Sequence, residues 1–158
     1  MNDPAVRRRL QRLSFLGAAT VGLLFLISSF LDPVWIDERR TAVTSWLASL
    51  WGGVTEGAVS ESTFGFLAGF TGPLLHFAGY FSLGLLVWAG LRLTPQEEER
   101  RRIGRISLLT LSVCLAVAVA DELLQLGLPG RQSSPADVVY DLLGAVAAAA
   151  GLALFFFC

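Results

Sequence analysis

Residues 106–157 read ISLLTLSVCLAVAVADELLQLGLPGRQSSPADVVYDLLGAVAAAAGLALFFF, two apolar runs on either side of a polar turn. The first run, Ile106 to Leu128, and the second, Val138 to Phe157, are each close to the ~20 residues that cross a hydrocarbon core of about 30 Å as a helix. A bilayer offers no water to backbone groups, so such runs are stable there as helices. This half of the chain is therefore predicted to form a membrane-spanning helical hairpin.

The rest of the 158-residue chain follows the same pattern. Hydrophobic residues make up 54% of the chain and charged residues 16%, against roughly 25% charged in an ordinary soluble domain. Two more apolar runs, Ser14 to Leu31 and Leu74 to Leu93, are long enough to span a membrane. We expect an all-α membrane protein, a four-transmembrane-helix bundle surrounded by membrane lipids. A net charge of −1 excludes a basic surface for nucleic acid.

The arginines indicate an orientation, because arginine accumulates on the cytoplasmic side of short loops. Nine of them lie before the first span or between the second and third: Arg7, Arg8, Arg9, Arg12, Arg92, Arg100, Arg101, Arg102 and Arg105. The other side has only Arg39, Arg40 and Arg131. We therefore expect a multi-pass plasma-membrane protein with both termini cytoplasmic, residues 1–13 forming the N-terminal cytoplasmic segment and 14–31 the first span.

Residues 32–73 are predicted to form an outer loop, because five glycines interrupt them: Gly52, Gly53, Gly57, Gly65 and Gly69. Within the loop, apolar residues at helical spacing place one stripe on a short helix: Val43, Trp46, Leu47, Leu50 and Trp51. Tryptophan is enriched at the headgroup level. We expect an amphipathic interfacial helix on the outer leaflet, followed by an apolar segment, TFGFLAGF, that dips into the membrane.

Three polar residues interrupt the third span about seven residues before its outer end: Asp121, Glu122 and Gln125. At 1.5 Å per residue this is on the order of 10 Å deep. A charged side chain near a bilayer centre costs about 2.5 to 3.5 kcal/mol, and somewhat less nearer the interface, so something must compensate two adjacent carboxyls. One explanation is structural: they pair with Arg131 or His76 and hold the helices together. The other is a binding or catalytic site.

Further polar residues lie toward the same side. His76 and Tyr80 are one turn apart on the second span, with Gly84 another turn on. Arg131 follows the turn Pro129-Gly130 and could neutralise the carboxyls or bind an anionic group.

The fourth span also begins with polar residues. Ser134, Pro135 and Asp137 resemble an N-cap, N1 and N3 sequence, which a capping role alone explains. Asp141 lies one turn further on the same face, and small residues then allow close helix approach: Gly144, Ala148 and Gly151. We predict one polar pocket that opens outward, with the ligand-binding candidates His76, Tyr80, Asp121, Glu122, Gln125, Arg131, Ser134, Asp137 and Asp141.

Three stretches resemble the VanZ-like family, which is named for a membrane protein associated with resistance to the glycopeptide teicoplanin. They are HFAGYFSLGLL (76–86), DELLQLGLPGRQSSPADVV (121–139) and DLLGAVAAAAG (141–151). The resemblance implies a small multi-spanning protein of the cell envelope without an established reaction, and residues 74–158 as the VanZ-like core. Two positions depart from the family pattern: Pro73 stands where a lysine is frequent, and Asp141 where an asparagine is usual.

Two functions are compatible with these residues. In the first, the pocket binds a lipid-linked or anionic envelope ligand without catalysis, and so changes how a glycopeptide reaches its target. In the second, a small intramembrane enzyme uses Asp121 or Glu122 as acid or base, with help from His76, while Arg131 holds an anionic head group. A divalent cation held by the acidic residues is a variant of the second. No Ser-x-x-Lys, Gly-x-Ser-x-Gly, His-Glu-x-x-His or phosphate-binding loop motif is present to favour the enzyme, and we expect no cofactor.

Overall fold

The computed structural model describes residues 3–31, 33–55, 58–93, 99–129 and 133–157, which form five helices and no strand. The helices are α1 (Pro4–Ser28), α2 (Pro33–Thr55), α3 (Glu61–Arg92), α4 (Glu99–Leu126) and α5 (Pro135–Phe157). Four of them, α1, α3, α4 and α5, are long and apolar enough to cross a membrane. The predicted all-α membrane bundle with four spans is confirmed.

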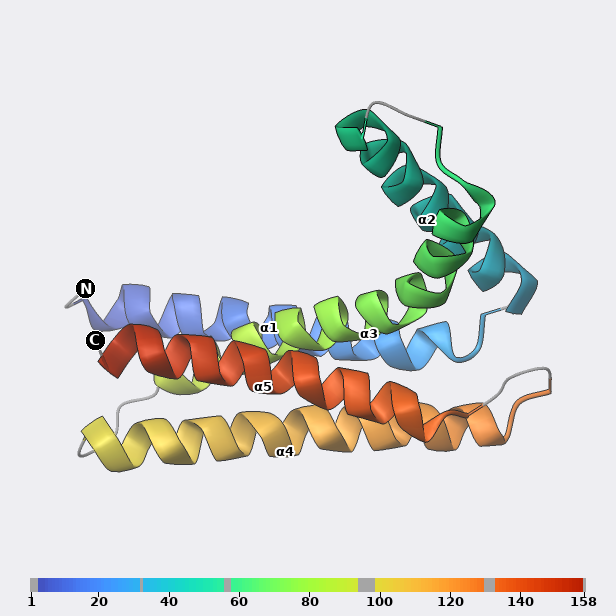
Figure 1. Cartoon of the computed structure of the whole chain (residues 1–158). Coiled ribbons are helices and arrows are strands. Elements are labelled where there is room, and N and C mark those ends of the chain that lie inside the picture. The colour runs from blue at the N-terminus through green and yellow to red at the C-terminus, as the bar shows by residue number, and fades with distance from the viewer. Residues whose placement is uncertain (1–2, 32, 56–57, 94–98, 130–132, 158) are drawn as a thin grey trace.

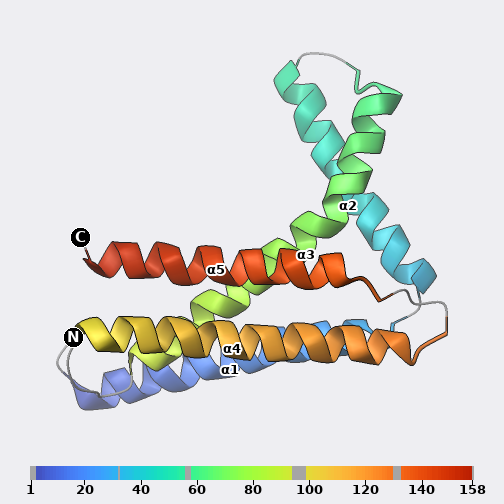
Figure 2. The ribbon, with the colours of Figure 1, turned by 60° about the horizontal axis from the view of Figure 1, so that its bottom comes forward.

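Helix α3 is the centre of the bundle, since it packs against each of the other four helices. Helices α1, α4 and α5 run alongside its second half, and the two chain ends lie at the same end of the bundle (Figures 1 and 2). The start of α1, the end of α3 and the start of α4 also lie there (Figure 1). The arginines of these segments therefore share one end of the bundle, where Arg8, Arg12 and Arg105 are exposed.

The closest packing is between α3 and α5. A Cβ atom at Gly84 of α3 would lie 3.0 Å from the Cβ of Ala148 in α5. At Gly144 of α5, a Cβ would collide with the backbone carbonyl of Phe77 in α3. The predicted role of Gly144 in close approach is confirmed, but that of Gly151 is wrong, because a Cβ there meets nothing within 4 Å.

Residues 32–73 differ most from the prediction. Helix α2 is much longer than the expected short helix, and α3 begins at Glu61, well before the predicted start of the second span at Leu74. Together α2 and the first part of α3 form a helical hairpin that leaves the bundle sideways (Figures 1 and 2). Gly52 and Gly53 lie within α2, and Gly65 and Gly69 lie within α3, whereas Gly57 lies outside the described residues. An isolated helical glycine costs only about 1 kcal/mol, which packing outweighs.

A hydrogen bond joins the two helices of this α2–α3 hairpin, and a proline lies where the hairpin meets the bundle. The buried hydroxyls of Thr44 in α2 and Thr71 in α3 lie 2.9 Å apart and share a hydrogen bond. Pro73 lies inside α3, and a proline within a helix removes one backbone hydrogen bond and bends the helix. Within the apolar stripe of α2, Trp46 and Trp51 are 60% and 54% exposed, whereas Val43 and Leu47 are half-buried.

Candidate functional site: a buried polar cluster

Polar side chains from four helices meet at the end of the bundle opposite the chain termini. We call them the polar cluster, which consists of Ser29, His76, Tyr80, Asp121, Glu122, Gln125, Ser133, Ser134, Asp137 and Asp141. The helices arrive there at different stages: α1 and α4 end, α5 begins, and α3 passes through (Figure 1). This arrangement brings together every predicted site residue that the structure describes. Arg131 lies outside the described residues.

His76 faces the first two turns of α5. Its Nδ1 atom lies 2.9 Å from Oδ1 of Asp141, at hydrogen-bond distance, and its Nε2 atom lies 4.0 Å from Oδ2 of Asp137. Asp137 and Asp141 are four residues apart, so they share one face of the helix. Asp141 is 1% exposed, and its contact with His76 links α5 to α3.

Asp121 connects α4 to the end of α1. The Ser29 hydroxyl donates a hydrogen bond to Oδ1 of Asp121, and Nε2 of Gln125 donates to Oδ2 over 3.0 Å. The carboxyl group is 2% exposed, and it is close enough to act electrostatically on His76 and Asp141. The predicted shared face of Asp121 and Gln125 is therefore confirmed.

Glu122 connects the end of α4 to the start of α5. Its Oε2 atom accepts hydrogen bonds from the Ser133 hydroxyl, at 2.7 Å, and from the Ser134 backbone N–H, at 2.6 Å. The predicted capping box is wrong in this respect, because the Ser134 amide donates to Glu122 rather than to Asp137. The Asp137 amide in turn donates to the backbone carbonyl of Ser134 at 2.9 Å. Glu122 thus accepts the hydrogen bond from the Ser134 amide that the predicted capping box assigns to Asp137.

The contacts also separate the two acidic residues from His76. Asp121 and Glu122 accept hydrogen bonds from serines and from Gln125, whereas His76 lies against the carboxyls of α5. Within the described residues the direct partners of the α4 carboxyls are therefore serines and Gln125, and Asp121 acts on His76 only through its charge. Pairing with Arg131 stays a prediction, because that residue lies outside the described ranges.

Three buried side-chain atoms of the cluster have no hydrogen-bond partner in the described part of the chain: the Tyr80 hydroxyl, Oε1 of Glu122 and Oδ2 of Asp141. A buried polar group without a partner costs about 1 to 3 kcal/mol. Native proteins satisfy nearly all such groups with protein or with ordered water. The two carboxylate oxygens can therefore accept further hydrogen bonds, and the Tyr80 hydroxyl can donate one.

An aromatic side chain of α1 covers the cluster. The Phe25 ring lies with its centroid 4.7 Å from that of Tyr80 and 6.3 Å from that of His76. Sequence reasoning missed both Phe25 and Ser29, because a phenylalanine and a serine near the end of an apolar span are ordinary residues. The one available signal was the Ser28-Ser29 pair in an otherwise apolar run.

The described residues do not favour a metal site. Across the ranges that the structure covers, no three side chains of His, Cys, Asp or Glu are placed to hold an ion. The divalent-cation variant thus has no support from the geometry. The cluster combines four carboxyls, an imidazole and a phenol with three serine hydroxyls and an amide, which suits recognition of a ligand that donates hydrogen bonds.

Comparison with known proteins identifies the family. Searches of curated proteins and of solved structures gave no match. A family profile described as VanZ/LLP1 matches residues 15–157, which includes all four candidate spans except the start of the first. The match also covers every residue of the polar cluster. The chain therefore belongs to the VanZ/LLP1 family.

Proposed function

We propose that this protein binds an amphipathic ligand of the cell envelope and holds the polar part of that ligand in the polar cluster. The observation that carries the proposal is that three buried atoms, on Tyr80, Glu122 and Asp141, have no hydrogen-bond partner among the residues that the structure describes. They come from three different helices, so their convergence is a property of the fold rather than of one segment. A ligand that supplies the missing hydrogen bonds would recover the cost of burying them.

The cluster favours a particular ligand chemistry. Carboxylates only accept hydrogen bonds, and a phenol can do both. The described residues therefore suit hydroxyl, amine or ammonium groups, as in the sugar or amino-sugar part of a lipid-linked envelope precursor. An anionic head group would need a cation close by, and Arg131 is the residue that the sequence places there.

We propose that the cluster faces outward, so that both termini and the exposed arginines are cytoplasmic. The arginine asymmetry supports this orientation. On the outer side, the α2–α3 hairpin would rest on the leaflet through its exposed tryptophans, since amphipathic rings are stable at the headgroup level. Held there, the protein would change how a glycopeptide such as teicoplanin reaches a lipid-linked target.

The proposal is tested by what the protein retains from membranes. Native mass spectrometry is applied to the wild-type chain and to the isosteric variants Asp141→Asn and Glu122→Gln, with Arg105→Gln as the matched control. We expect an amphipathic ligand to remain on the wild type and on the control, and to be lost from both cluster variants at equal abundance. Identical bound lipids on all four proteins would contradict the proposal.

A cellular arm of the same experiment addresses the glycopeptide. Cells that produce equal amounts of each variant are compared for teicoplanin susceptibility. We expect the wild type and Arg105→Gln to shift susceptibility in the same direction, and Asp141→Asn to abolish the shift. If Asp141→Asn shifts teicoplanin susceptibility as much as the wild type does, the polar cluster is not the cause of the glycopeptide effect.

One observation favours an enzyme instead. An aspartate that holds one ring nitrogen of a histidine is a device that orients the other nitrogen for proton transfer, and Asp141 lies 2.9 Å from Nδ1 of His76. In this alternative His76 moves the proton and Asp121 or Glu122 assists. The test is to incubate the reconstituted protein with envelope lipid extract. A product made by the wild type but not by His76→Gln, with ligand binding retained, would establish catalysis.

A further inference from the structure

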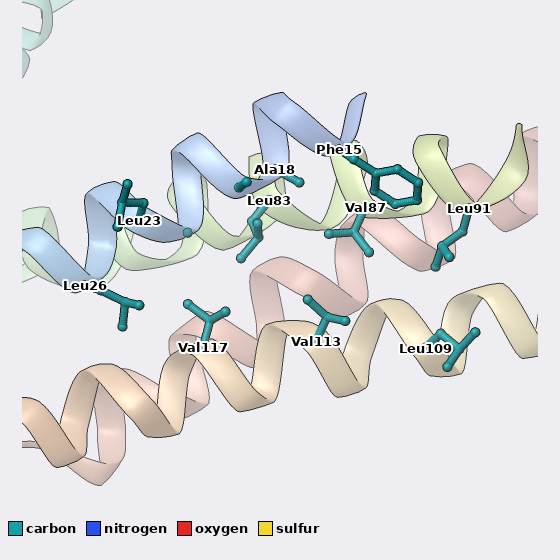
Figure 3. Close-up of a pocket in the computed structure, with 12 residues that line it drawn as sticks. Phe15, Ala18, Leu23, Leu26, Leu83, Val87, Leu91, Leu109, Val113 and Val117 are labelled. Atoms are coloured by element: carbon teal, nitrogen blue, oxygen red, sulfur yellow. The ribbon is translucent and has the colours of Figure 1, made fainter. Parts of the chain in front are cut away.

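An apolar groove opens beside the polar cluster, between α1 and α4. Its volume is about 480 Å³. Figure 3 shows side chains of α1 and α4 on its two sides and side chains of α3 at its base. The groove exists because α1 presents small residues there, among them Ala18, Ala19 and Gly22. A Cβ atom at Gly22 would reach only to 3.9 Å from Val117 across the groove.

The groove ends where the polar cluster begins. On each of its three helices, a lining residue lies one turn from a cluster residue: Leu26 from Ser29, Leu83 from Tyr80, and Val117 from Asp121. One turn of helix is 5.4 Å. The hydrogen bond from Ser29 to Asp121 joins α1 to α4 at this end. Because the two sites adjoin, a molecule with a polar group in the cluster could extend an apolar part past this hydrogen bond into the groove.

The dimensions of the groove indicate a single hydrocarbon chain. Along α1 it reaches from Phe15 to Leu26, which at 1.5 Å per residue is roughly 16 Å. This is about half of the ~30 Å hydrocarbon core, the depth that one lipid tail covers. Every residue that lines the groove is apolar or glycine, so the groove offers water no hydrogen bond. A tail would regain the dispersion contacts that its walls otherwise lack.

We infer that the ligand is a lipid, one hydrocarbon chain of which lies in the groove between α1 and α4 while its head group occupies the polar cluster. The inference rests on the proposed function and adds to it the part of the ligand that the cluster cannot recognise. Of the four candidate spans, α1 is the least buried, yet it contributes Phe25 and Ser29 to the cluster. A lipid bound between α1 and α4 would give α1 this role. Helix α1 then acts as one wall of a continuous head-and-tail site.

The probe for this inference is an alkyl glucoside with a diazirine near the end of its chain. The reconstituted protein is illuminated in vesicles of phosphatidylethanolamine and phosphatidylglycerol, and the adducts are mapped by mass spectrometry. Gly22→Leu and Val113→Phe fill the groove from its two sides. Gly151→Leu is the matched control for the first, because it adds the same side chain to a span where nothing lies within 4 Å.

We expect adducts on groove residues such as Leu26 and Val117, lost in Gly22→Leu and Val113→Phe and retained in Gly151→Leu. Adducts spread evenly over lipid-facing residues such as Leu24 and Leu154 would overturn the inference. The groove and the cluster can fail separately. If Asp141→Asn abolishes binding but Gly22→Leu does not, the groove is wrong and the proposed function stands. If groove adducts persist in Asp141→Asn, the cluster does not hold the head group and the proposed function is contradicted.

Discussion

The two ends of the bundle both carry charge, but they differ in where the charge lies. At the end that holds the termini, Arg8 and Arg105 are exposed. At the opposite end, Asp121, Glu122 and Asp141 are 2%, 7% and 1% exposed. Exposed arginines at helix ends cost little and bias membrane orientation, whereas buried charged groups are costly unless they are paired or hydrogen-bonded. The comparison teaches that burial, rather than charge alone, distinguishes the proposed binding site from the arginines that we propose to set the orientation.

The largest expected effect comes from the packing that brings the helices of the polar cluster together. Gly144→Leu forces a side chain into the backbone of α3 at Phe77. Overpacking costs typically 1 to 3 kcal/mol and occasionally more, and here the obstacle is backbone, which cannot move aside. We expect less folded protein in membranes, measured as the yield of monodisperse protein after extraction in detergent and size-exclusion chromatography. Gly151→Leu, nearer the arginine end, should fold normally. Equal losses of folded protein in both variants would show that close helix packing does not distinguish the cluster end from the arginine end.

The next effect concerns the buried carboxyls. Asp141→Ala removes the hydrogen bond to His76, and hydrogen bonds that involve charged groups contribute about 1.5 to 3 kcal/mol. Arg105→Ala at the exposed end should change the free energy of unfolding by about 0.5 kcal/mol or less. Unfolding in mixed micelles measures both. A combined variant with His76→Ala should show non-additivity of about 0.5 to 3 kcal/mol, and simple additivity would mean that the contact carries no coupling.

The smallest effect distinguishes a cap from a cluster residue. A serine N-cap lost to alanine costs about 1 kcal/mol, but the Ser134 side chain makes no such bond within the described chain, and its amide is held by Glu122. We therefore expect Ser134→Ala to be nearly neutral in the same unfolding assay, and Glu122→Ala to cost about 1 to 3 kcal/mol. A larger loss of stability in Ser134→Ala than in Glu122→Ala would instead support the local capping box.

Much of the site was predictable because charge in an apolar run is rare. Asp121, Glu122 and Gln125 stand out in the sequence for that reason, and the apolar runs predicted the four spans. The partners of these residues were not predictable. Ser29 is far away along the chain, and only the packing of α1 against α4 brings it to Asp121. In the same way, the role of Glu122 depends on the path of the chain between α4 and α5.

The hairpin shows a different limit. Glycine frequency over residues 32–73 predicts a broken loop, but α2 contains Gly52 and Gly53, and α3 contains Gly65 and Gly69. Intrinsic propensity is a weak guide where tertiary packing can outweigh it, and here Thr44 and Thr71 pair across the hairpin. Pro73 was visible in the sequence only as a departure from the family pattern. Its consequence, a proline within the long helix α3 where the hairpin meets the bundle, became visible only in the structure.

The central claim is that the polar cluster is a ligand site reached from outside the cell. It is tested most directly by labelling single cysteines in intact cells with a membrane-impermeant maleimide. The background carries Cys158→Ser, and the remaining Cys114 is buried. The positions are Ser133→Cys at the cluster, Gly127→Cys on the exposed turn after α4, and Arg105→Cys at the arginine end.

We predict that Ser133→Cys and Gly127→Cys are labelled in intact cells and that Arg105→Cys is labelled only after the membrane is opened. Adding the alkyl glucoside should slow the labelling of Ser133→Cys, because the head group covers it, and leave Gly127→Cys unchanged. Labelling of Arg105→Cys alone would contradict the orientation. Equal rates at Ser133→Cys with and without the glucoside would contradict the polar cluster as the binding site for that head group.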